Sequence, residues 1–269
     1  MKCNFQNFTY LLVSISLCVM PELVSAVEDG ELAQKLNNPI AALISVPMEY
    51  NRDSDIGPNK TGEVDSIKFT PVIPWNISEN YNLITRTVFS YVDQDIPEYG
   101  LDENGLSDIA QSFWFSPKAV GDSGVIWGLG GIVLLDSATE DSLGAGKWGA
   151  GPSVVMLKQA GPWTYGALGH YLRDFAGDSD RTDVEQFFVQ PFLSYNFNAK
   201  TGVTLQSEIT RDMEAEDTGA FVLLQFNRMF KVGGQIMQGR IGVRHWYERL
   251  GFGPDSTELN LRLTLLFPK

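Results

Sequence analysis

The chain has 269 residues and carries 20 Lys plus Arg against 33 Asp plus Glu, which gives a net charge of -13 and a pI near 4.5. Acidity of this size argues against nucleic acid or anionic lipid headgroups as direct partners. The mean hydropathy of -0.08 is ordinary for a soluble protein, but a membrane barrel has the same average because its lumen residues are polar.

The first residues have the layout of a secretory signal. Lys2 precedes an apolar run from Tyr10 to Met20, and Val24-Ser25-Ala26 places small residues where signal peptidase accepts them. We expect cleavage after Ala26, so that residues 1–26 are a signal peptide. The run is shorter than the about 20 apolar residues that a spanning helix needs.

Both cysteines, Cys3 and Cys18, lie within this predicted signal. An alternative is that Cys18 is a lipoprotein acceptor, but the bulky Leu17 stands before it where a small residue is expected. On the main interpretation, the exported chain has neither a disulfide framework nor thiolate chemistry.

Residues 27–39 follow as a short segment with helix-forming residues around Leu32 and Leu36, and Pro39 ends it. We predict a short periplasmic helix or a partial plug here. No convincing helical period follows it.

Residues 40–269 instead read as about twelve strands, each bounded by Gly, Pro, Asn or Asp. The predicted strands are Ile40–Asn51, Val64–Trp75, Tyr81–Val92, Ser107–Ser116, Gly124–Leu135, Lys147–Lys158, Trp163–Arg173, Val184–Phe197, Thr201–Thr210, Gly219–Arg228, Gln235–Tyr247 and Glu258–Phe267.

The last predicted strand alternates most clearly. Leu259, Leu261, Leu263 and Leu265 fall on one face, and Asn260, Arg262 and Thr264 fall on the other. A strand between lipid and a polar lumen needs this pattern. Many membrane barrels end on an aromatic residue that the assembly machinery reads, whereas here Phe267 is followed by Pro268-Lys269, so we expect recognition of this strand to tolerate two extra residues.

The connections support a membrane barrel rather than a soluble sandwich. Long acidic loops alternate with short turns along the chain, and the turns carry lysines such as Lys118, Lys158 and Lys200. Aromatic residues cluster near both strand ends, as belts at two membrane interfaces do. We therefore predict an all-β, transmembrane, antiparallel up-and-down β-barrel of about twelve strands in the outer membrane of a Gram-negative bacterium.

Several stretches carry a family resemblance over nearly all of the predicted exported chain. They are residues 32–47 (LAQKLNNPIAALISVP), 71–74 (PVIP), 111–118 (QSFWFSPK), 147–152 (KWGAGP), 161–168 (GPWTYGAL), 190–195 (QPFLSY) and 265–269 (LLFPK). With these motifs the chain resembles the outer-membrane transporter family named for the MetA-pathway of phenol degradation, which is often mislabelled neuromedin U. The resemblance implies a barrel that takes up small, aromatic or apolar molecules, and it implies no catalytic residue.

Alternation along the strands predicts which polar side chains face the lumen. The lumen candidates are Glu49, Lys68, Arg86, Gln186, Gln190, Glu208, Gln238, Arg240, Arg244 and Arg262, together with Gln225 and Asn227. They favour a path for anionic or hydrogen-bonding solutes. A second interpretation is a network that only fills a narrow barrel.

Apolar residues share the inward face. They are Ile84, Val88, Ile126, Ile132, Leu134, Phe188 and Phe192. A mixed lining suits an amphipathic or aromatic ligand. Packing against the N-terminal segment is the alternative, and that segment is then the candidate gate.

The sequence has few of the residues that a catalytic or transition-metal site needs. Only His170 and His245 are present, and neither has a serine in a recognisable motif near it. We expect no enzyme activity, no cofactor and no transition-metal site.

The predicted function is transport of small organic solutes across the outer membrane, with lipid, lipopolysaccharide, a small-molecule solute and the assembly machinery as partners. The acidic loops could hold divalent cations against lipopolysaccharide, although a solvated surface is the commoner role of such runs. One alternative function is a closed structural or adhesive barrel, and another is a lipid-modifying enzyme.

Overall fold

Residue 32 and residues 34–267 are described by the computed structural model of the chain. The predicted signal peptide, residues 27–31 and 33 of the N-terminal segment, and Pro268-Lys269 lie outside the described residues. No helix in the described part is long and apolar enough to cross a membrane.

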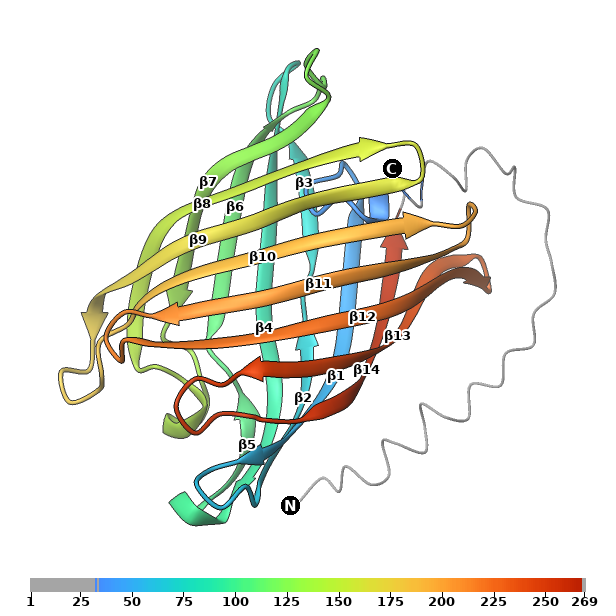
Figure 1. The fold of residues 1–269 in the computed structure, drawn as a ribbon. Helices are drawn as coiled ribbons and strands as arrows, with labels where there is room; N and C mark the ends of the chain where they lie inside the picture. The colour runs from blue at the N-terminus through green and yellow to red at the C-terminus, as the bar shows by residue number, and fades with distance from the viewer. Residues whose placement is uncertain (1–31, 33, 268–269) are drawn as a thin grey trace.

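The described chain forms one closed antiparallel sheet around a lumen (Figure 1). Barrel strands that follow each other in the chain pair side by side, and the last strand pairs with the first. The strands are β1 (Ile44–Ile56), β2 (Gly62–Phe69), β3 (Val72–Asn76), β4 (Tyr81–Ile96), β5 (Leu101–Leu106), β6 (Ile109–Pro117), β7 (Val125–Leu135), β8 (Lys147–Ala160), β9 (Trp163–Gly177), β10 (Glu185–Asn196), β11 (Thr201–Asp212), β12 (Asp217–Val232), β13 (Gln235–Glu248) and β14 (Thr257–Phe267). Two short 3-10 helices, η1 (Pro97–Tyr99) and η2 (Asp141–Leu143), lie in the connections.

Two barrel strands are interrupted. β2 and β3 are separated by Thr70-Pro71, and β5 and β6 by Ser107-Asp108. Pro71 has no N–H to give to the ladder, and its carbonyl instead accepts a 3.1 Å hydrogen bond from the Thr87 amide. Because each broken pair makes one strand, the fourteen segments form twelve barrel strands, which confirms the predicted fold class.

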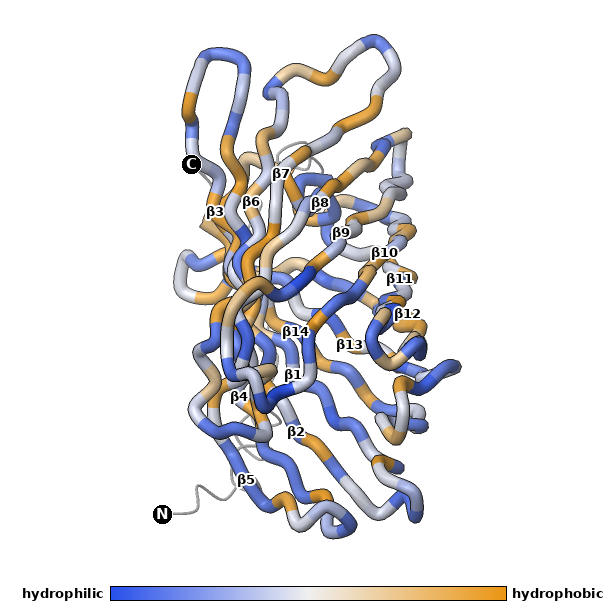
Figure 2. The backbone as a smooth tube through the Cα atoms, turned by 90° about the vertical axis from the view of Figure 1, so that its left-hand side faces the viewer, coloured by the Kyte–Doolittle hydropathy of each residue, from blue (hydrophilic) through white to orange (hydrophobic). Residues whose placement is uncertain are grey.

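The outer face of the barrel is apolar. Large hydrophobic side chains that are about half exposed occur on successive strands: Leu129, Met156, Leu193, Leu205, Leu224, Phe226, Ile241, Val243 and Leu259. Figure 2 shows hydrophobic and hydrophilic residues interleaved along the strands. In water such a belt would be a very large exposed apolar patch, whereas lipid tails solvate it.

The final strand follows the predicted alternation. Leu259 is 51% exposed, whereas Asn260 is fully buried and Thr264 is 4% exposed. Leu266 follows on the same face as Asn260 and Thr264 but is apolar, and its 1% exposure places it inside, against the N-terminal segment.

Two differences from the predicted strands affect the lumen and the loops. β1 begins at Ile44 rather than Ile40, because residues 40–43 turn into the barrel instead of joining the sheet. The connection between β11 and β12, expected to be long, has four residues (213–216), because the two strands stay paired as far as Asp212 and Asp217.

The seam between β1 and β14 closes the barrel, and side chains on its inner face reinforce it. Asn260 on β14 donates from Nδ2 to Asn51 Oδ1 on β1 at 2.7 Å. Nearer the acidic loops, Asp53 Oδ1 on β1 accepts from Arg244 Nη2 at 2.6 Å and from Trp246 Nε1 at 2.7 Å, both on β13. Side chains therefore join β1 to β13 across the intervening β14.

We expect Asp53→Ala to destabilise the folded barrel by about 3 kcal/mol, because it leaves the buried Arg244 guanidinium without its counterion. Urea unfolding in lipid vesicles, followed by tryptophan fluorescence, measures this change. Asp122→Ala, in the exposed turn before β7, is the matched control and should change stability by less than about 0.5 kcal/mol. Equal stability of the two variants would contradict this role for the seam.

Candidate functional site

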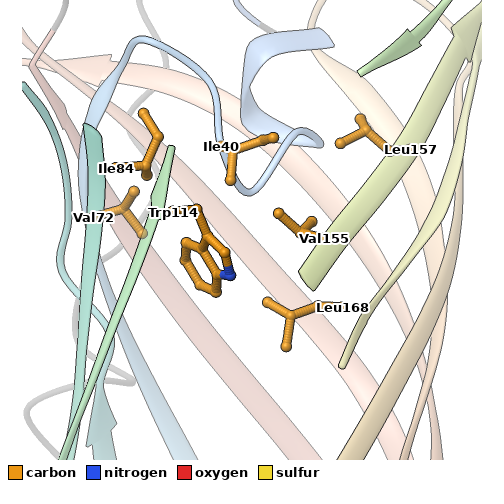
Figure 3. Packing of buried hydrophobic residues seen from close by; sticks show 7 residues of the cluster. All are labelled: Ile40, Val72, Ile84, Trp114, Val155, Leu157 and Leu168. Carbon is orange, nitrogen blue, oxygen red and sulfur yellow. The ribbon is translucent and has the colours of Figure 1, made fainter. Parts of the chain in front are cut away.

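The N-terminal segment enters the lumen and inserts Ile40 into an apolar cluster. Ile40 is 4% exposed and packs with Ile84, Trp114 and Val155, none of which is exposed to solvent. In Figure 3, Ile40 projects from the segment between Ile84 on one wall and Val155 on the other. The other buried members are Val72, Leu157 and Leu168, with Ile126, Phe188 and Phe192 against them. The apolar part of the lumen is thus filled with help from the segment.

Further contacts fix the segment to the short-turn end of the barrel. Asn37 Nδ2 donates to Asn196 Oδ1 at 3.1 Å, and Gln34 Nε2 donates to the Gly161 carbonyl at 3.0 Å. The Gln34 carbonyl in turn accepts from Gln159 Nε2 at 2.7 Å. A second apolar cluster joins Ala41, Leu43 and Leu266, with Leu32, Leu36 and Ile236 packed against it. These described residues lie where a partial plug would lie, and the assignment of residues 27–39 as a unit stays a prediction.

A cavity of about 150 Å³ remains between the segment and the barrel wall. Its walls combine apolar and charged side chains from strands on opposite sides of the barrel. The lining includes Leu36, Asn37, Asn38, Ala41 and Leu43 from the segment, and Glu49, Lys68, Val72, Arg86, Leu168, Gln190, Phe192, Gln206, Glu208, Gln238, Arg240 and Arg262 from the strands.

One wall of the cavity is a row of charged residues on adjacent strands. Arg240 on β13 pairs in register with Arg262 on β14, Arg262 with Glu49 on β1, and Glu49 with Lys68 on β2. Glu49 is 3% exposed, and its carboxylate forms ion pairs with Arg262 and, at 3.3 Å, with Lys68 Nζ. A carboxylate buried this deeply persists only when charged partners compensate the lost water.

The second carboxylate of the cavity comes from β11, two strands along the sheet from β13. Glu208 Oε1 on β11 accepts from Gln190 Nε2 at 3.0 Å and from Gln206 Nε2 at 3.3 Å. Arg86 comes from β4, and its register partner on β3 is Val72, so its side chain begins beside the apolar cluster.

Of the twelve predicted lumen residues, the structure gathers eight around this one cavity: Glu49, Lys68, Arg86, Gln190, Glu208, Gln238, Arg240 and Arg262. Gln225 and Asn227 on β12 are buried but do not line it. Gln186 and Arg244 lie elsewhere. Gln186 lines a second, more open pocket of about 440 Å³ near the acidic loops, with Asp108, Asp183 and Asp212. The Arg244 guanidinium lies over the rings of Phe221 and Trp246 and is held by Asp53.

Both residues point inward, as predicted, but they lie at another height along the barrel axis. Strand alternation fixes the side of the sheet that a residue faces, whereas height depends on the tilt and register of the closed sheet. Sequence reasoning also missed Gln206 and the segment residues Asn37 and Asn38. Strand alternation could have predicted Gln206 as a lumen residue, because it stands two residues before Glu208 and therefore lies on the same face of the strand.

The two histidines lie apart from each other. His170 stacks on Phe188 with ring centroids 4.8 Å apart, and His245 Nδ1 is 2.8 Å from Thr257 Oγ1. Among the described residues, no group of three His, Cys, Asp or Glu side chains is arranged to hold a metal ion.

Solved structures share this architecture. An outer membrane channel from Pseudomonas putida F1 superposes with a TM-score of 0.64 at 13% identity, covering 84% of this chain and 96% of that one. The chain has the fold of an outer-membrane β-barrel. The fold and the apolar belt together place it in the outer membrane of a Gram-negative bacterium.

More distant likenesses are the NanC porin, with a TM-score of 0.49 at 12% identity over 84% of this chain and 100% of that one, and the β domain of a Bordetella autotransporter, with 0.44 at 12% over 85% and 100%. No family model and no curated protein matches the sequence. The resemblance to the MetA-pathway family therefore stays a prediction.

We expect Glu49→Gln to destabilise the barrel by about 3 kcal/mol, because Arg262 and Lys68 then face each other without their shared carboxylate. The double variant Glu49→Gln/Arg262→Gln should recover part of this loss, since it removes one of the two unpaired cations. Urea unfolding of the four proteins in this cycle gives the coupling energy. Glu79→Gln, in an exposed turn, is the control. A coupling energy near zero would show that the pair contributes nothing.

Proposed function

We propose that the barrel passes small organic solutes across the outer membrane and that residues 34–43 form its gate at the short-turn end. The observation that carries this proposal is the cavity itself. It lies between the segment and the wall, and the segment closes one side of it. Because the segment is not a strand of the sheet, it can leave without breaking the ladder bonds that close the barrel.

The composition of the lumen favours a transport function rather than a lumen that is closed by packed side chains. Structural filling is best achieved by complete packing, whereas here charged groups line open space beside an apolar cluster. Such a mixed lining suits solutes with an apolar body and a polar group. The Pseudomonas putida channel is similar in fold, and its channel activity extends to this chain only through this proposal.

The gate should respond to Ile40 because that side chain anchors the segment in the apolar cluster. Truncation of a buried isoleucine to alanine costs about 3 kcal/mol. If truncation of Ile40 destabilises the docked state of the segment by this amount, the population of barrels with a released segment rises about 100-fold. We therefore expect Ile40→Ala to raise solute flux severalfold while the β ladders stay intact.

Single-channel current in planar bilayers, together with swelling of liposomes in arabinose or glycine, measures this flux for the full-length protein. Ile77→Ala, in the exposed turn between β3 and β4, is the matched control and should behave as the unaltered protein. If neither the unaltered protein nor Ile40→Ala carries current or admits solute, the lumen is closed. The structural or adhesive alternative would then replace the transport proposal.

A further inference from the structure

We propose that the lumen cavity binds the carboxylate group of a small organic anion with an apolar body, and that Arg86 and Arg240 are its receptors. This inference rests on the proposed function, because it names the class of solute for the same lumen.

The first argument is the local excess of positive charge. The cavity is lined by Lys35, Lys68, Arg86, Arg240 and Arg262, and by the acidic side chains of only Glu49 and Glu208 among the described residues. The whole chain carries a net charge of -13, so the cavity has the opposite sign to the rest of the protein. A lining of this sign inside low-dielectric walls attracts anions and repels cations.

The second argument is that neither acidic side chain forms a hydrogen bond or an ion pair with Arg86 or Arg240. Glu49 is shared by Arg262 and Lys68, and Glu208 accepts from Gln190 and Gln206. Within residues 34–267, the Arg86 guanidinium forms no hydrogen bond or ion pair, and the charges of Glu208 and Glu49 act on it only from beyond bonding distance.

Arg240 has polar contacts, but all of them are with amide oxygens. It donates from Nε to Gln238 Oε1 at 2.8 Å and, more weakly, from Nη1 to Gln225 Oε1 at 3.4 Å. Each guanidinium offers five N–H donors in a planar fork, so both arginines keep donors that can serve a solute. A carboxylate matches that fork with two parallel hydrogen bonds.

The third argument concerns the body of the solute. Val72, Leu168 and Phe192 line the same cavity, and all three belong to the apolar cluster or pack against it. An apolar cavity of about 150 Å³ accepts a single benzene ring in a well-studied protein, and this cavity has about that volume. Together the ring-sized space and the two arginines fit a one-ring or short-chain monocarboxylate.

Benzoate and benzyl alcohol are suitable probes, because they share the ring and differ in charge. We expect the full-length barrel, purified in detergent, to bind benzoate at least tenfold more tightly than benzyl alcohol in isothermal titration calorimetry. Arg86→Met and Arg240→Met should each weaken benzoate binding at least tenfold and leave benzyl alcohol unchanged. Methionine keeps much of the apolar stem and removes the charge.

Two further variants separate a binding role from a structural one. Arg228→Met, at an exposed position on β12, is the matched control and should bind benzoate as the unaltered barrel does. Arg86→Lys keeps the charge but loses the fork, so its affinity should lie between those of the unaltered protein and Arg86→Met. Retained heat modifiability on gels would show that each variant is folded.

Equal binding of benzoate and benzyl alcohol, or unchanged benzoate binding in both methionine variants, would overturn this inference. Competition by chloride at the same concentration as benzoate would overturn the apolar-body requirement. A barrel that conducts but does not bind benzoate leaves the proposed function standing. If the barrel binds benzoate but no variant shows flux, the proposed transport function is refuted and the proposed carboxylate site stands.

Discussion

The pairing of the last strand with the first is the constraint on which the rest of the structure depends. No water is present in the hydrocarbon region to satisfy backbone N–H and C=O groups, so the sheet must close on itself. Here β14 pairs with β1 from Ile44↔Phe267 to Tyr50↔Leu261. The same pairing brings Arg262 and Glu49 side by side, and so closure of the barrel also creates the charged wall of the cavity.

The lumen has an apolar side and a polar side, and the N-terminal segment (residues 34–43) lies against both. Its apolar side must be covered, and Ile40 does this by joining Ile84, Trp114 and Val155. The two carboxylates on its polar side must also be compensated, and the ion pairs of Glu49 and the amides around Glu208 do this without the segment. The segment is consequently held by apolar packing and by a few hydrogen bonds of Gln34 and Asn37, which is a weaker attachment than a ladder of strand pairs.

Much of the fold follows from the sequence because a barrel strand has two different solvents on its two faces. The alternation of Leu259, Asn260 and Thr264 reports this directly, and the order of turns and acidic loops fixes the topology. The partners of each lumen residue do not follow from alternation. That Glu49 meets Arg262, and that Arg244 meets Asp53, depends on tilt and register, which only the closed sheet defines.

The interruption between β2 and β3 at Thr70-Pro71 leaves this part of the barrel wall with fewer pairs to β1. On the short-turn side of the break, β3 pairs with β1 at the single position Ser45↔Val72. On the acidic-loop side, β2 pairs with β1 at successive residues from Met48 to Asp53. Thr70 and Val72 both line the cavity. The cavity therefore lies against a stretch of wall in which β1 has few ladder partners, and we expect a bulky occupant to deform this stretch before it deforms the continuously paired strands.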